Sequence, residues 1–138
     1  MHQILYVSVE THHHSREDLE ALLKQSRDKN AKLGITGILI YYKKHFFQIL
    51  EGEKDVIFEL FRTIRKDNRH FSVILVWDQE VLERSFKDWS MAFVNLNEID
   101  KSKLTNFSDF LEKGFTTEIT EQHLTLAQKL LLEFKSSL

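Results

Sequence analysis

His45-Phe46-Phe47-Gln48-Ile49-Leu50-Glu51-Gly52 is the segment that decides the interpretation of this chain, because it places one primary amide inside an apolar, aromatic-rich run. Such a run, after a turn-like Lys43-Lys44 pair, predicts a β-strand. Alternate side chains of a strand share a face, so Phe46, Gln48 and Leu50 point the same way. A buried amide without hydrogen-bond partners costs about 1–3 kcal/mol. Gln48 is therefore either a satisfied core glutamine or a group that binds a ligand.

Length and composition predict one globular domain. The chain has 138 residues, of which 42% are hydrophobic and 29% are charged, and this length can bury a substantial core. The net charge of −2 argues against a protein that tracks nucleic-acid phosphates. The absence of cysteine excludes a disulfide, a thiolate metal site and a cysteine nucleophile. Neither a signal peptide nor a membrane-spanning stretch is evident, so we expect a cytoplasmic protein.

The residues before the central segment predict a strand followed by a helix. Residues 3–9 are largely apolar and suit a strand covered on both faces. Its Tyr6 is either a core residue or the polar end of a pocket. Ser15 resembles a helix N-cap, and Gly34 suits a left-handed exit after Leu33. The apolar stripe between them consists of Leu19, Leu22 and Leu23.

Two groups of polar side chains flank or lie on this helix. Three adjacent histidines, His12 to His14, precede it, but neighbouring residues of an extended loop rarely converge on one ion, so we predict no metal site. Ser26 and Asn30 lie four residues apart on the stripe face. They are either half-exposed polar residues or ligands at the seam between helix and sheet.

The residues around and after the central segment predict four further elements. Residues 35–42 form a strand that pairs with the central one as a hairpin. A helix over 53–66 carries the apolar stripe Val56, Ile57, Leu60, Phe61 and Ile64. A polar exit, Asp67 to His70, leads to a strand over 71–76 and a last strand over 86–95.

This order predicts an α+β fold of the ferredoxin-like βαββαββ type, with a five-stranded mixed sheet. Both helices should cover one face of the sheet. Residues 100–113 and 118–136 show amphipathic helical spacing. We expect these two C-terminal helices to cover the opposite face or to meet a partner chain.

The chain resembles the BLUF family of flavin-based blue-light sensors over roughly residues 1–95. The residues that carry the resemblance are Tyr6, Asn30, the Gly34-Ile35-Thr36-Gly37 turn, the strand from Phe46 to Gly52, Asp67 with Arg69-His70, and Trp89-Ser90-Met91. The last part is similar to that of short stand-alone members, in which two helices follow the sensor. The resemblance implies a photosensor domain over residues 1–97 and a helical extension over 98–138.

The resemblance implies a flavin site between the two long helices, above Tyr6 and Gln48. Asn30 would hydrogen-bond the polar edge of the ring, with Ser26 nearby. Leu22 and Ile64 would pack as apolar side chains on either side of the ring.

The resemblance places Asp67, Arg69 and His70 near the ribityl-phosphate side or the pocket rim. The chain departs from members that carry an arginine at the position of Thr63, which leaves the phosphate contacts open. FAD is the expected cofactor, with FMN and riboflavin as alternatives.

The resemblance also implies the photochemistry. Flavin supplies light absorption, Tyr6 gives an electron and a proton, and Gln48 is left rotated or tautomerised with a new bond toward the flavin carbonyl. A small red shift follows. Trp89 and Met91 are the candidate switch that passes this change to the C-terminal helices. Because no bond to carbon is made or broken, we predict a photoreceptor and not an enzyme.

Other classes of function remain open from the residues themselves. A flavin-free ferredoxin-like adaptor would use the same fold for protein contacts. An RNA-binding domain could stack bases on Phe46 and Phe47, but the net acidity opposes it. For the sensor, we expect a downstream protein partner and a homo-oligomer, with no nucleic-acid or membrane partner.

Overall fold

The computed structural model describes residues 1–84, 86 and 90–95. The elements follow one another as β1 (His2–Glu10), α1 (Arg16–Leu33), β2 (Thr36–Tyr42), β3 (His45–Gly52), α2 (Lys54–Arg65), β4 (His70–Glu80) and β5 (Ala92–Asn95). This is the predicted order of strands and helices.

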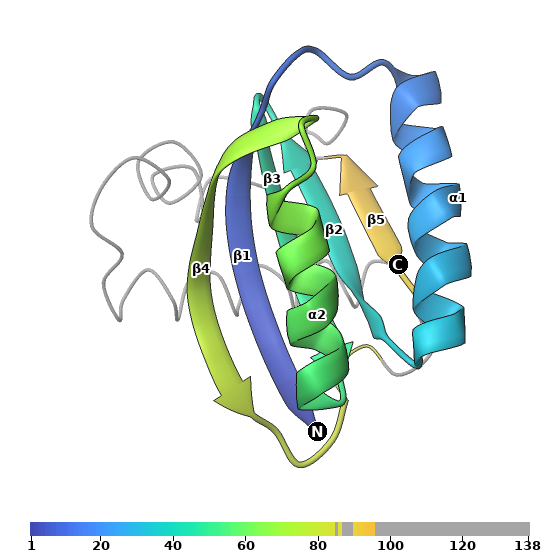
Figure 1. Ribbon diagram of the computed structural model, residues 1–138. Helices are drawn as coiled ribbons and strands as arrows, with labels where there is room; N and C mark the ends of the chain where they lie inside the picture. The colour runs from blue at the N-terminus through green and yellow to red at the C-terminus, as the bar shows by residue number, and fades with distance from the viewer. Residues whose placement is uncertain (85, 87–89, 96–138) are drawn as a thin grey trace, which may run out of the picture.

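The strands form one sheet in the order β4-β1-β3-β2-β5. The first four strands in this order pair antiparallel with one another, and the short β5 runs parallel to β2. Both helices lie on the same face of the sheet, α2 over its middle and α1 along the side of β5 (Figure 1). The ferredoxin-like fold predicted from the sequence is therefore confirmed.

The boundaries of α1 follow from its sequence. The Ser15 hydroxyl accepts a hydrogen bond from the Asp18 amide at 3.1 Å, and the Asp18 carboxylate accepts one from the Ser15 amide at 3.0 Å. This reciprocal pair satisfies amides that the first helical turn leaves without carbonyl partners. At the other end, Gly34 has φ +68°, a conformation that glycine adopts without a steric penalty.

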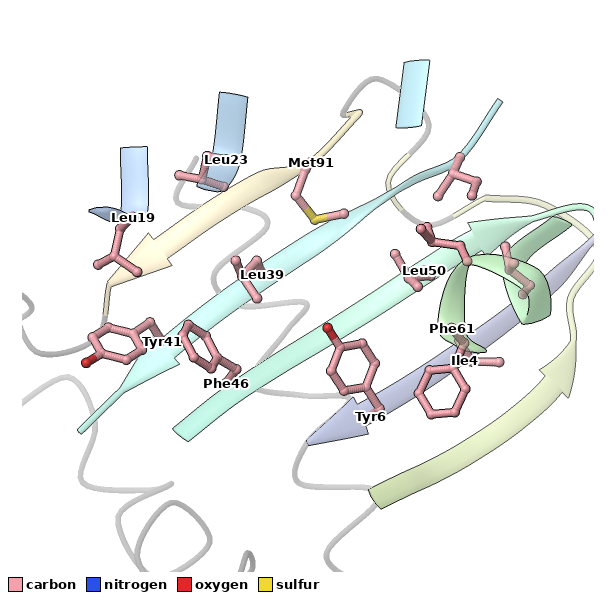
Figure 2. Close-up of a cluster of buried hydrophobic side chains, with 13 residues drawn as sticks. Ile4, Tyr6, Leu19, Leu23, Leu39, Tyr41, Phe46, Leu50, Phe61 and Met91 are labelled. Atoms are coloured by element: carbon pink, nitrogen blue, oxygen red, sulfur yellow. The ribbon is translucent and has the colours of Figure 1, made fainter. Parts of the chain in front are cut away.

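The core beneath the helices takes one side chain in two from each central strand. Ile4 and Tyr6 of β1, Phe46 and Leu50 of β3, and Leu39 of β2 are buried there. Figure 2 shows these side chains on one side of the sheet, facing Leu19 and Leu23 of α1. Side chains on the opposite face, such as Leu5, Ile40 and Phe47, are buried as well.

The predicted ends of the last two strands were wrong. β4 reaches Glu80, four residues past the predicted end, because β1 remains its hydrogen-bonding partner as far as His2. β5 starts at Ala92 rather than at residue 86. Ser90 and Met91 lie before the strand, since side chains of α1 bind their carbonyls in place of a neighbouring strand.

Trp89 and the helices expected over 100–113 and 118–136 lie outside the described residues. Among the residues that are described, no helix is long and apolar enough to cross a membrane.

Candidate functional site

A pocket of about 210 Å³ lies between the two helices and the sheet. Its walls come from β1, β2 and β3, from one side of α1 and α2, and from the segment that joins α2 to β4. All nine residues that the family resemblance implies for a flavin site line this one pocket: Tyr6, Leu22, Ser26, Asn30, Gln48, Ile64, Asp67, Arg69 and His70.

Tyr6 and Gln48 meet at the floor of the pocket. They are directly opposed in the antiparallel pairing of β1 with β3, where the side chains of partner residues lie side by side. The Tyr6 hydroxyl donates a hydrogen bond to Gln48 Oε1, and it points from β1 over β3 in Figure 2. Gln48 Nε2 in turn lies 3.4 Å from the Met91 sulfur. Both polar side chains are buried, and the amide has one partner at its oxygen and one at its nitrogen.

The surroundings of Tyr6 keep its hydroxyl protonated. Burial raises the pKa of Tyr6, and the nearby Asp67 carboxylate raises it further, whereas Arg69 acts in the opposite direction. The ring of Phe61 packs against Tyr6 with ring centres 5.4 Å apart. Tyr6 is therefore a neutral hydrogen-bond donor at physiological pH.

Asp67 and Arg69 form an ion pair at one end of the pocket. Arg69 Nε lies 3.0 Å from both Asp67 oxygens, and the Arg69 amide also donates to Asp67 at 2.9 Å. The bound guanidinium holds the pKa of Asp67 below its usual value. The pair thus places one fixed positive and one fixed negative group beside Tyr6.

His70 joins β4 to both β1 and α2. Its Nε2 lies 2.6 Å from the Ile64 carbonyl and its Nδ1 lies 2.8 Å from the Ser8 hydroxyl. Because a carbonyl can only accept, the Nε2 carries the proton in this arrangement. His70 therefore fixes the end of α2 that carries Ile64 against the sheet.

On the α1 side, Asn30 is buried, whereas Leu22 and Ser26 are partly buried. Asn30 Nδ2 donates to the Ser90 carbonyl at 3.0 Å. Leu22 and, from α2, Ile64 are partly buried apolar residues that pack on the edge of the core. The pocket thus combines apolar walls with a few fixed polar groups, as ligand sites commonly do.

Sequence reasoning missed two residues at this site. His14 is buried, lines the pocket, and packs edge-on against Phe46 with ring centres 5.3 Å apart. Its Nδ1 lies 3.2 Å from a Glu10 oxygen, and its Nε2 has no hydrogen-bond partner among the described residues. Arg27, which does not line the described pocket, donates to the Met91 carbonyl at 2.9 Å.

Residues 1–92 match the BLUF family, described as sensors of blue-light using FAD. The chain belongs to the BLUF family. The BLUF fold is also seen in solved relatives. The chain is 32% identical to BlsA in its photo-activated state, with a TM-score of 0.79 and coverage of 95% of this chain and 94% of BlsA. BlrB, a BLUF protein in its dark state, is 32% identical with a TM-score of 0.72, and 93% of this chain and 96% of BlrB are covered.

Among curated relatives, the photoactivated adenylate cyclase subunit beta of Euglena longa is 38% identical over 89 residues. That match covers 64% of this chain and 10% of the relative, so the chain spans about a tenth of the cyclase subunit's length. The family match over residues 1–92 of this chain is to a sensor domain.

BLUF domains bind flavin, either FAD, as the family description states, or FMN, as in the BlrP1 complex of Klebsiella pneumoniae. The residues of this pocket suit such a group. Polar atoms at the walls of the pocket come from the amides of Gln48 and Asn30 and from His14 Nε2, which has no hydrogen-bond partner among the described residues. Partly buried Leu22 and Ile64 provide apolar surface for a planar ring.

Proposed function

We propose that this BLUF chain is a blue-light photoreceptor that holds flavin in the pocket between α1 and α2. The observation that carries the proposal is the buried chain of contacts from the Tyr6 hydroxyl through the Gln48 amide to the Met91 sulfur. A redox-active phenol bonded to a rotatable amide in a pocket can convert light absorption into a change of hydrogen bonding. This conversion of light absorption into a change of hydrogen bonding uses neither a nucleophile nor a hydrolytic base.

Each of the nine predicted residues receives a role in this proposal. Asn30 and Ser26 would bind the polar edge of the ring, and Leu22 and Ile64 would pack on its faces. Asp67, Arg69 and His70 would lie toward the ribityl-phosphate side, where a cation can pair with a phosphate. Bound flavin supplies the absorption of blue light and one-electron redox chemistry.

The protein's part of the photochemistry belongs to Tyr6 and Gln48. Tyr6 would release the proton on its hydroxyl and pass one electron to the bound flavin. Gln48 Oε1, which already accepts the Tyr6 hydrogen bond, is the atom that receives this proton. As Oε1 gains this proton, Nε2 would give up one of its own toward the cofactor, which leaves the side chain as its neutral imidic-acid tautomer. Return of one proton and one electron to Tyr6 would restore the phenol, and the amide would re-form in a rotated orientation with its oxygen and nitrogen exchanged.

Rotation of Gln48 would change its contact with Met91. In the present orientation the amide nitrogen donates toward the thioether sulfur at 3.4 Å. After rotation the amide oxygen would face the sulfur, and neither atom carries a hydrogen to donate. Two acceptors in contact repel, so the rotated glutamine would displace Met91. We infer that this is how the switch begins, with Trp89 as the second member of the pair implied by the family resemblance.

We further propose a division of labour along the chain, with residues 1–97 as the photosensor and residues 98–138 as a helical output segment. Output would then act through association with a downstream protein or a second copy of the chain. The amphipathic spacing of residues 100–113 and 118–136 supports this proposal.

The test is the absorption spectrum of the purified chain, recorded in the dark and after blue light. We expect a flavin spectrum that shifts slightly to the red and recovers in darkness. Gln48→Leu and Tyr6→Phe should each abolish the shift while flavin stays bound, because each removes one member of the hydrogen-bond chain. Thr36→Ser on β2 is a control that should shift as the wild type does.

A colourless protein that takes up no added FAD, FMN or riboflavin would overturn the proposal in favour of the flavin-free adaptor. A yellow protein with no reversible shift would show flavin binding without the proposed switch. Extraction of the bound flavin followed by chromatography would identify which of the three flavins is carried.

A further inference from the structure

Three side chains hold the segment Ser90-Met91 in place. From α1, Arg27 Nε donates to the Met91 carbonyl at 2.9 Å and Asn30 Nδ2 donates to the Ser90 carbonyl at 3.0 Å. From β3, Gln48 Nε2 contacts the Met91 sulfur at 3.4 Å. The backbone of this segment is thus fixed by one helix, and its buried side chain by the strand that carries the photoactive amide.

The three contacts differ in strength and in their distance from the chemistry. The Arg27 bond is assisted by a full positive charge, whereas the Asn30 bond joins neutral groups and the Gln48 contact uses a weak sulfur acceptor. Asn30 and Gln48 line the flavin pocket, but Arg27 is not among the residues that line it as described. Arg27 therefore makes the strongest of these contacts without belonging to the cofactor site.

The segment leads directly into β5. Ala92 follows Met91 and pairs with Ile38 in the parallel ladder between β5 and β2. A displacement that carries the Met91 backbone with it must either break the Arg27 bond or pull on the start of this ladder. The Arg27 bond consequently opposes the displacement that rotation of Gln48 would cause.

We propose that Arg27 is a positioning residue of the photoswitch, whose bond to the Met91 carbonyl stabilises the dark arrangement and sets the lifetime of the lit state. This inference rests on the proposed function. The bond is made in the dark arrangement and released in the lit one. Removing this bond raises the free energy of the dark arrangement relative to the lit one. It also raises the free energy of the transition state that leads back to the dark arrangement, so recovery in darkness slows.

The side chain of Arg27 is exposed overall, so its replacement opens no cavity in the core. Arg27→Met keeps an apolar stem of similar length and removes all donors. Arg27→Lys keeps the charge and restores a donor, although not the planar guanidinium. Lys24→Met, one turn earlier on the exposed side of α1, removes the same charge from the same helix and serves as the matched control.

The experiment follows the decay of the red-shifted spectrum in darkness for the flavin-loaded full chain, together with amide hydrogen exchange of residues 90–95 in the dark. Arg27→Met should bind flavin, show the red shift, and recover about three- to tenfold more slowly than the wild type, as expected when the transition state of recovery has regained only part of one charge-assisted hydrogen bond. Its amides over 90–95 should exchange faster. Arg27→Lys should recover at an intermediate rate, and Lys24→Met at the wild-type rate.

Recovery and exchange of Arg27→Met that equal those of the wild type would overturn this inference, as would equal slowing by Lys24→Met. Failure of the proposed function has a different signature, because the wild type would then show no reversible shift at all. If Arg27→Met were poorly folded, Arg27→Lys would still test the inference through its intermediate rate.

Discussion

Asp67 interacts both with Arg69 at the rim of the pocket and with Tyr6 at its floor. Its carboxylate is bound by Arg69 and acts on the buried Tyr6. The guanidinium lowers the pKa of Asp67 in the folded protein below the usual carboxyl value of 3.8. A group with a depressed folded pKa contributes stability above its unfolded pKa, and this contribution is lost as the pH falls through the folded value.

We predict that Asp67→Asn destabilises the chain at pH 7 and loses this effect in acid. The ion pair is partly exposed, with 40% of the Arg69 side chain accessible, so solvent screening limits the difference to less than about 1 kcal/mol. Thermal unfolding at pH 7 and at successively lower pH should show the two proteins converging below pH 3.8. Asp28→Asn, which removes an exposed carboxylate of α1, serves as the matched control for the loss of one negative charge. A constant difference at every pH would contradict the role given to the pair.

Individual site residues differed in how far the sequence could predict them. Tyr6 and Gln48 could be placed on facing positions because strands alternate strictly and both lie in apolar runs. His14 could not, since three adjacent histidines give no sign of which one folds inward. Arg27 could not either, because its partner is a backbone carbonyl that lies 64 positions away in the chain.

The β2–β3 hairpin is the element that holds Gln48 in register. Gly37 of β2 is opposed to Leu50 of β3, and a Cβ atom at Gly37 would lie 1.9 Å from the Ile49 carbonyl oxygen. The strands can approach this closely only because glycine has no side chain. By contrast, a Cβ at Gly34 would meet no atom within 4 Å, although Gly34 has φ +68°.

We predict that Gly37→Ala is the more damaging of two glycine substitutions. Alanine at position 37 must push β2 away from β3, which costs about 1–3 kcal/mol as in other overpacked sites. Alanine at position 34 would meet no neighbouring atom, so its only cost is the free energy of the left-handed backbone conformation, about 1 kcal/mol. Denaturant unfolding of both variants measures the two costs. Equal destabilisation, or a photoactive Gly37→Ala protein as stable as the wild type, would contradict this account of the hairpin.

Whole elements were predicted well where an amphipathic period or a cap defined them, as in α1 and α2. The start of β5 was not, because the run from Phe86 to Asn95 looks strand-like throughout. Residues 90 and 91 lie outside the ladder between β5 and β2, because Asn30 and Arg27 bind their carbonyls. Such side-chain contacts from a distant helix override local β propensity.

At the scale of the molecule, one face of the sheet lines the pocket and the other face carries its own network of hydrogen bonds. Gln48 faces the pocket, whereas the fully buried Glu51 of the same strand accepts hydrogen bonds from Gln3 at 2.9 Å and from the Phe86 amide at 2.8 Å. Gln79 of β4 donates to Gln3 at 2.8 Å. These bonds connect β1, β3, β4 and residue 86 on the face opposite the pocket. A light signal should therefore leave through Met91 and β5, because Gln48 contacts the Met91 sulfur and takes no part in the bonds on the opposite face.

This reasoning predicts where amide exchange will change when the full chain is illuminated. We expect faster exchange over residues 90–95, where the Gln48 contact with Met91 is lost, and altered exchange within residues 98–138, the proposed output segment. β4 should exchange equally in dark and light, because its bonds to β1 and to Gln3 do not depend on Met91. Mass spectrometry of peptic peptides under continuous blue light measures all three regions in one sample, and Gln48→Leu should remove every difference. Exchange over 86–138 that is identical in dark and light would show that the signal does not leave the pocket through Met91, whereas a change in β4 alone would mean that it crosses the sheet through β1.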